Sequence, residues 1–198
     1  MVRYRSDDSD GDSAILLTPN RSRQGHQNKK KCYCAILSCV GTLIILVAIA
    51  TIVLIAFHAS CKITWQFNED CDTIRNAIVN QIHNWTSDTN CQYGGEKCLY
   101  HLISETPKMV VAYHVTPKAH YRDNLKFLFI KDPGDGVQCE VQGFSASEIF
   151  YAILDFGTNY CNLHNLIVGS GIDRVPGYKE ETSDSICTQY SIANCTHF

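Results

Sequence analysis

Charge is missing from one long stretch of this chain. Residues 35–57, AILSCVGTLIILVAIATIVLIAF, contain no Asp, Glu, Lys or Arg. As a helix this segment would be about 35 Å long, enough to cross a bilayer hydrocarbon core of about 30 Å. A cleaved signal peptide would have a shorter apolar stretch closer to the start of the chain. A core helix this long and wholly apolar does not suit a domain of this size. The sequence therefore predicts a retained transmembrane helix.

Large apolar residues are scarce before this segment. Residues 1–34 carry seven Lys and Arg and four Asp, and such a composition buries too little apolar surface to offset the entropy lost on ordering. We therefore expect a disordered tail. Basic residues closely precede the apolar segment, whereas only Lys62 follows it within a comparable distance. This asymmetry places the tail in the cytoplasm and predicts a single-pass type II signal-anchor protein, with the membrane as an integral partner.

One short motif interrupts the polar tail. In GDSAILLTP, residues 11–19, the acidic Asp12 stands four positions before the pair Leu16 and Leu17. This spacing resembles the acidic dileucine signal that clathrin adaptors bind as an extended peptide. It predicts an adaptor as a cytoplasmic partner and an endosomal or lysosomal membrane location. A chance hydrophobic triplet, in a protein resident at the plasma membrane, is the alternative.

Cysteines separate into two groups at the apolar segment. Cys32 and Cys34 lie just before it and are candidates for palmitoylation, with plain reduced thiols as the alternative. An even eight lie beyond it, as expected for a disulfide framework in an oxidising compartment. These eight are Cys61, Cys71, Cys91, Cys98, Cys139, Cys161, Cys187 and Cys195. The short loop around two glycines makes Cys91 with Cys98 the favoured pair. Two sequons on the same side predict N-glycosylation at Asn84 and Asn194.

The region after the apolar segment predicts an α+β fold. A juxtamembrane linker is expected over residues 58–69 and a disulfide-stapled ectodomain over 70–198. Ile74, Ile78 and Ile82 form one helical stripe, which predicts a helix over 70–85. Short runs rich in β-branched and aromatic residues then predict an antiparallel meander of four or five strands. Those runs are residues 99–104, 109–115, 124–130 and 137–144, with 149–157 as a fifth strand or a short helix and 161–169 as a C-terminal helix.

Motifs for several kinds of chemistry are absent. The chain has no HExxH or CxxC pattern, no P-loop ending in Gly-Lys-Ser/Thr, and no GxSxG sequence. We therefore assign no catalytic residue, metal ligand or cofactor. If all eight cysteines pair, none remains as a nucleophile. The formal net charge of −3 gives no indication of nucleic acid as a partner.

The densest group of polar side chains lies in residues 151–166. Asp155, Asn159, Tyr160 and His164 are candidates for a binding surface beside apolar anchors. The interpretation we favour for this stretch is nevertheless a capped turn that starts a helix pinned to a strand through its cysteine. The favoured function is binding of a protein, glycan or lipid ligand. A membrane-anchored luminal hydrolase or transferase, using Asp155 and His164 with His114, and an adhesion or receptor ectodomain are the alternatives.

Overall fold

The chain divides into two units, residues 1–49 and 50–198, and each is described separately. The computed structural model describes residues 21–56, 58–149 and 151–196, so the predicted sorting motif at Asp12, Leu16 and Leu17 lies outside the described residues.

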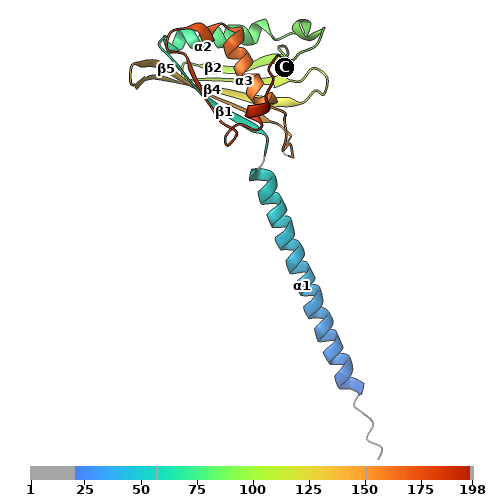
Figure 1. Ribbon diagram of the computed structural model, residues 1–198. Coiled ribbons are helices and arrows are strands. Elements are labelled where there is room, and N and C mark those ends of the chain that lie inside the picture. Colours follow the sequence, from blue (N-terminus) through green and yellow to red (C-terminus); the bar gives the residue numbers. More distant parts are fainter. Residues whose placement is uncertain (1–20, 57, 150, 197–198) are drawn as a thin grey trace, which may run out of the picture. The chain divides into compact units, whose positions relative to one another are not determined.

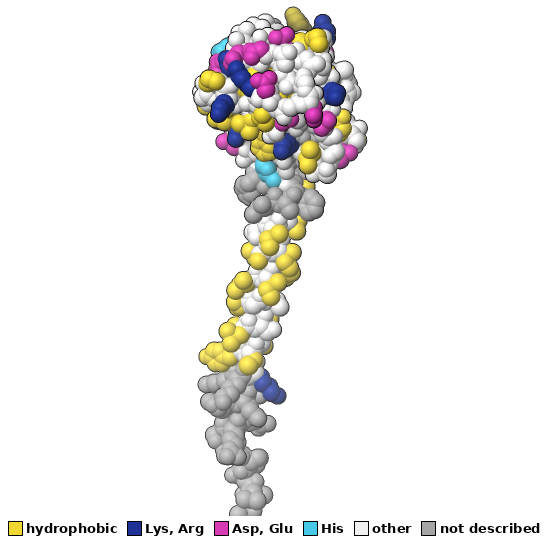
Figure 2. Space-filling view, turned by 90° about the vertical axis from the view of Figure 1, so that its left-hand side faces the viewer, with side chains coloured by type: hydrophobic (Ala, Val, Ile, Leu, Met, Phe, Trp, Pro, Cys, Tyr) yellow, Lys and Arg dark blue, Asp and Glu magenta, His cyan; other side chains and the backbone are white. Residues whose placement is uncertain are grey.

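Helix α1 runs without a break from Arg21 to Ala56. Its segment Lys31–Val53 has a mean hydropathy of 2.8 and no buried residue, so it is long and apolar enough to cross a membrane by length and composition. Hydrophobic side chains line it in the space-filling view (Figure 2). The helix includes residues 21–34, which we expected to be unfolded. The apolar helix can extend into these residues, because elongating an existing helix costs less free energy than nucleating a new one. Gln, Lys and Arg, which are frequent there, are also good helix formers.

The second unit contains a six-stranded antiparallel sheet (Figure 1). Its order is β2-β3-β4-β5-β1-β6, so the first strand of the chain inserts between the last strand of the meander and a short edge strand. The strands are β1 (Ser60–Phe67), β2 (Tyr100–Thr106), β3 (Met109–Val115), β4 (Arg122–Gly134), β5 (Val137–Ser147) and β6 (Lys179–Glu181).

Two helices cover one face of this sheet, as Figure 1 shows. Helix α2 (Cys71–Asn84) and helix α3 (Thr158–Gly169) share a single hydrophobic core with the inward-facing strand residues. Trp65 and Phe127 are fully buried there, with ring centroids 6.3 Å apart. The predicted stripe Ile74, Ile78 and Ile82 is fully buried in α2. Single turns of 3-10 helix are Thr89–Cys91, Ile172–Arg174 and Tyr190–Ile192.

The α+β class and the four-strand meander are confirmed, and two strands were not expected. Strand β1 occupies residues that we assigned to a linker, and β6 pairs with it. The described part of 149–157 is neither strand nor helix, and α3 begins directly after Gly157, which adopts a left-handed conformation (φ 83°). Gly169 is the last residue of α3, and Ser170 is its C-cap.

Four disulfides pair all eight predicted cysteines. They are Cys61–Cys187, Cys71–Cys139, Cys91–Cys98 and Cys161–Cys195, and the third confirms the favoured pair. Helix α3 is therefore pinned to the C-terminal segment through Cys195, and not to a strand. Cys32 and Cys34 are unpaired and exposed on α1.

Candidate functional site

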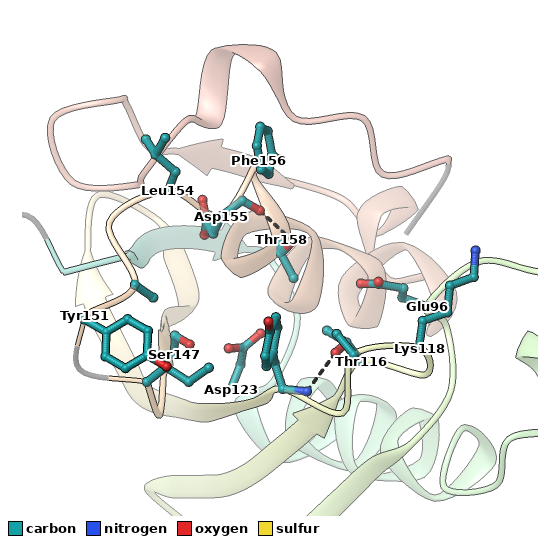
Figure 3. A pocket seen from close by; sticks show the side chains of 14 residues that line it. Glu96, Thr116, Lys118, Asp123, Ser147, Tyr151, Leu154, Asp155, Phe156 and Thr158 are labelled. Carbon is teal, nitrogen blue, oxygen red and sulfur yellow. Dashed lines mark hydrogen bonds between the residues drawn. The ribbon is translucent and has the colours of Figure 1, made fainter.

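A pocket of about 370 Å³ opens at the start of α3 (Figure 3). Four segments line it: the loop before β2, the turn between β3 and β4, the end of β5, and the loop before α3. The last two segments are continuous in the sequence, and the antiparallel order of the sheet brings the first two, from earlier in the chain, to the same place.

The loop before α3 supplies apolar side chains to the pocket. Tyr151, Leu154 and Phe156 line the cavity (Figure 3). All three side chains are also exposed at the molecular surface. Gln189 of the C-terminal segment holds the loop backbone, because its Oε1 accepts hydrogen bonds from the amides of Asp155 (2.9 Å) and Phe156 (2.7 Å). The apolar wall thus depends on a segment more than thirty residues further along the chain.

Glu96 reaches the pocket from a loop that is fixed at several points. The Cys91–Cys98 disulfide closes this loop, and Gly94 and Gly95 turn it with positive φ angles of 111° and 86°. His114 lies 2.9 Å from the Glu96 carbonyl oxygen through its Nε2. A carbonyl oxygen only accepts, so Nε2 carries the hydrogen and donates it. Burial lowers the pKa of His114 to about 4, so this contact is made by a neutral imidazole above that pH.

Asp123 lies in the pocket wall across from Leu154 and Phe156, as Figure 3 shows. Asp123 is 4 % exposed, and Asn162 of α3 donates a hydrogen bond of 2.8 Å from Nδ2 to its Oδ2. The preceding turn is held by Thr116, whose Oγ1 accepts from the amide of Tyr121 at 2.9 Å. Asp123 is therefore a carboxylate fixed by α3 at the edge of the core.

Burial and the negative charge of Asp123 both disfavour the ionised form of Glu96 in the pocket. Burial, together with the smaller effect of the Asp123 charge, raises the pKa of Glu96 to about 7, although Lys118 opposes the shift. Burial also raises the pKa of Asp123, against the hydrogen bond from Asn162. Glu96 Oε2 is buried without a hydrogen-bond partner among the described residues. A cation placed in the pocket would relieve both the desolvation and the repulsion.

The four predicted binding-surface residues do not form one surface. Asp155 lines the pocket and caps α3, accepting from the amides of Gly157 and Asn159, each at 3.1 Å. Asn159 is fully buried, with Ser145 donating to its Oδ1 at 2.5 Å. Tyr160 and His164 instead contact Glu180 of β6. The phenol donates at 2.7 Å, and His164 Nδ1 lies 3.0 Å from the carboxylate.

The residues suggested for a hydrolase are also separated. His164 contacts Glu180, His114 contacts the Glu96 carbonyl, and Asp155 caps α3. None of the described hydrogen bonds joins two of the three. Within the described ranges, no group of three or more His, Cys, Asp or Glu residues is arranged to hold a metal ion.

Glu96 and Asp123 were not predicted as site residues from the sequence, and neither were the apolar side chains of Tyr151, Leu154 and Phe156. Asp123 did carry a signal, because it shares strand parity with Leu125, Phe127 and Phe129, so a carboxylate falls on the inward face. Glu96 carries no comparable signal, since its environment is created by segments from elsewhere in the chain.

Comparison with known proteins finds no match: no protein-family model, no curated protein and no solved structure is similar to this chain.

Proposed function

We propose that the chain is a type II membrane glycoprotein of the endolysosomal and cell-surface system, whose disulfide-rich domain binds a ligand in the pocket at the start of α3. The membrane part rests on the apolar segment Lys31–Val53 and on the basic residues before it. The glycoprotein part rests on the sequons at Asn84 and Asn194, both of which are exposed. The four disulfides favour an oxidising compartment for the domain.

One observation carries the choice of ligand. A single cavity combines an apolar wall, from Tyr151, Leu154 and Phe156, with the carboxyl groups of Glu96 and Asp123. Binding pockets typically have mostly apolar walls and a few polar groups that orient the ligand. The ligand that fits is a compact apolar group that carries a protonated amine. Its charge would neutralise the carboxylates of Glu96 and Asp123, and its apolar body would cover the apolar wall.

Three probes of one shape test this chemistry at pH 8: phenethylammonium, 2-phenylethanol and 3-phenylpropionate. We expect affinity to fall in that order, with the cation binding at least tenfold more tightly than the anion, which corresponds to about 1.4 kcal/mol. The measurement is the change in NMR methyl shifts of Ala119 and Ala152, which line the pocket, with the buried Ala112 as an internal control. Equal affinity for the three probes would exclude an acidic binding site.

Trafficking is tested in the tail. Replacing Leu16 and Leu17 with alanine should move the steady-state population from endolysosomes to the cell surface, because two apolar contacts with the adaptor are lost. Asp12→Ala should act in the same direction but more weakly, since exposed charge contacts contribute about a kcal/mol or less. Replacing Ile15, a spacer, is the matched control. Surface biotinylation measures the distribution, and a double mutant that distributes like the parent would refute the sorting signal.

A further inference from the structure

The loop before α3 presents a cluster of exposed apolar side chains, which we call the apolar loop (residues 151–156). Tyr151, Leu154 and Phe156 are 62 %, 63 % and 66 % exposed. Ile153 of the same loop and Ile186 of the C-terminal segment are also exposed, and both border a second shallow hollow. Contiguous exposed apolar groups of this kind mark a surface that contacts something apolar.

The position of the apolar loop in the chain indicates what it contacts. The amide of Ala59 donates to the carbonyl oxygen of Ala152 at 2.7 Å, and His58 Nε2 lies 3.2 Å from the carbonyl oxygen of Ile149. Only two residues separate Ala59 from Ala56, where α1 ends, and that length of chain spans at most about 11 Å. The apolar loop is therefore tethered by hydrogen bonds to the residues that directly follow the apolar helix.

The apolar loop also carries little charge, which suits contact with an apolar partner. Its one charged residue, Asp155, directs its carboxylate to the amides of Gly157 and Asn159 at the start of α3. The side chains it exposes are one tyrosine, one phenylalanine, one leucine and one isoleucine. Aromatic and aliphatic residues in this combination are typical of segments that lie at the boundary between lipid headgroups and acyl chains.

We infer that the apolar loop docks on the lipid bilayer, with Leu154 and Phe156 inserted at the interface beside the point where the chain leaves the membrane. This inference rests on the membrane anchorage proposed above. Because Leu154 and Phe156 also line the pocket, docking would place the pocket mouth at the lipid surface. An amine with an apolar body could then enter from the membrane.

The test uses the full chain reconstituted in phosphatidylcholine nanodiscs that contain a lipid with a doxyl quencher near the top of the acyl chain. Phe156→Trp and Leu154→Trp each add one fluorophore to the apolar loop. Phe144→Trp is the matched control, because Phe144 is also an exposed aromatic residue (41 %) but lies on the face of the sheet opposite to α2 and α3. The signal of the parent chain, which has the buried Trp65 and the partly buried Trp85, is subtracted.

We expect the quencher lipid to remove at least half of the added fluorescence at positions 154 and 156 and less than a tenth at position 144. Equal quenching at 144 and 156, in a chain that stays with the nanodisc, would overturn the docking while leaving the anchor and the pocket intact. The tryptophan at position 156 could instead be protected from aqueous acrylamide and not quenched by the lipid. That result would assign the surface to contact with a second protein copy, and would also overturn the docking on lipid. A chain that does not co-elute with nanodiscs would refute the anchorage itself.

Discussion

Glu96→Gln is expected to stabilise the disulfide-rich domain at pH 8 and to weaken its binding of phenethylammonium at the same pH. The two effects have opposite signs, because the charge of Glu96 is unfavourable for the empty fold and favourable for a bound cation. Residues kept for binding commonly reduce stability in this way. A residue with a purely structural role would not produce this combination.

The stability effect follows from proton linkage. The folded-state pKa of Glu96 is about 7, above the ordinary value of 4.5, so between these values the folded chain binds more protons than the unfolded chain. Stability therefore falls as pH rises through this range, and the penalty is fully present above it. Each pKa unit corresponds to about 1.4 kcal/mol, and discounting for the partial exposure of Glu96 leaves about 1–2 kcal/mol. The midpoint of thermal unfolding should rise by about 3–6 °C at pH 8 and should not change at pH 4.

Glu181→Gln is the control for the loss of one negative charge, since Glu181 is exposed on β6 and lies outside the pocket. It should leave both the melting midpoint and the probe affinity close to those of the parent. A lower midpoint for Glu96→Gln at pH 8 would show that the carboxylate makes a stabilising contact, and would contradict the assignment of Glu96 to ligand binding.

Binding by the parent chain should also depend on pH. The phenethylammonium ion stays protonated throughout the range, so a change between pH 8 and pH 5 reports on the protein. Protonation of Glu96 as pH falls through about 7 removes its attraction for the cation. Affinity should therefore fall on acidification, and Glu96→Gln should remove most of this dependence. A ligand held by this carboxylate at the cell surface would be released in acidic endosomes.

The sequence predicted those elements whose signal is local. Strand β3 was predicted with the residues 109–115 that form it, and the stripe of α2 is buried as expected, because residue periodicity and turn residues determine these features within one segment. Strand β1 carried a local signal too, since Ile63, Trp65 and Phe67 alternate with polar residues. It was missed because its position directly after the apolar segment suggested a linker.

The pocket could not be predicted in the same way. The raised pKa of Glu96 depends on its burial and on Asp123, which follows it by more than twenty residues. The apolar loop is held by Gln189, more than thirty residues further along the chain. Such contacts are created by strand order and by disulfide connectivity. Eight cysteines allow 105 connectivities, so the sequence could not specify which segments meet.

Removing the Cys61–Cys187 disulfide is expected to cause a much larger loss of stability than removing Cys91–Cys98. The first bridge closes a sequence separation of 126 residues and the second closes 7. On the chain-entropy account, the two bridges contribute about 5 and about 2.5 kcal/mol respectively, because a longer closed loop restricts the unfolded chain more. Urea unfolding of the paired alanine variants, followed by the fluorescence of Trp65 and Trp85, measures the difference.

The same variant should also loosen the apolar loop. Cys187 lies two residues before Gln189, whose side chain accepts from the amides of Asp155 and Phe156. Loss of the anchor to β1 should therefore speed hydrogen exchange at these two amides more than at Ala112 in the core of β3. The Cys91–Cys98 variant should leave the exchange of Asp155 and Phe156 unchanged, while disturbing the loop that carries Glu96. The contrary result would be equal stability losses in the two variants, with equal hydrogen-exchange rates at Asp155 and Phe156. It would show that the C-terminal segment holds the apolar loop without help from Cys187.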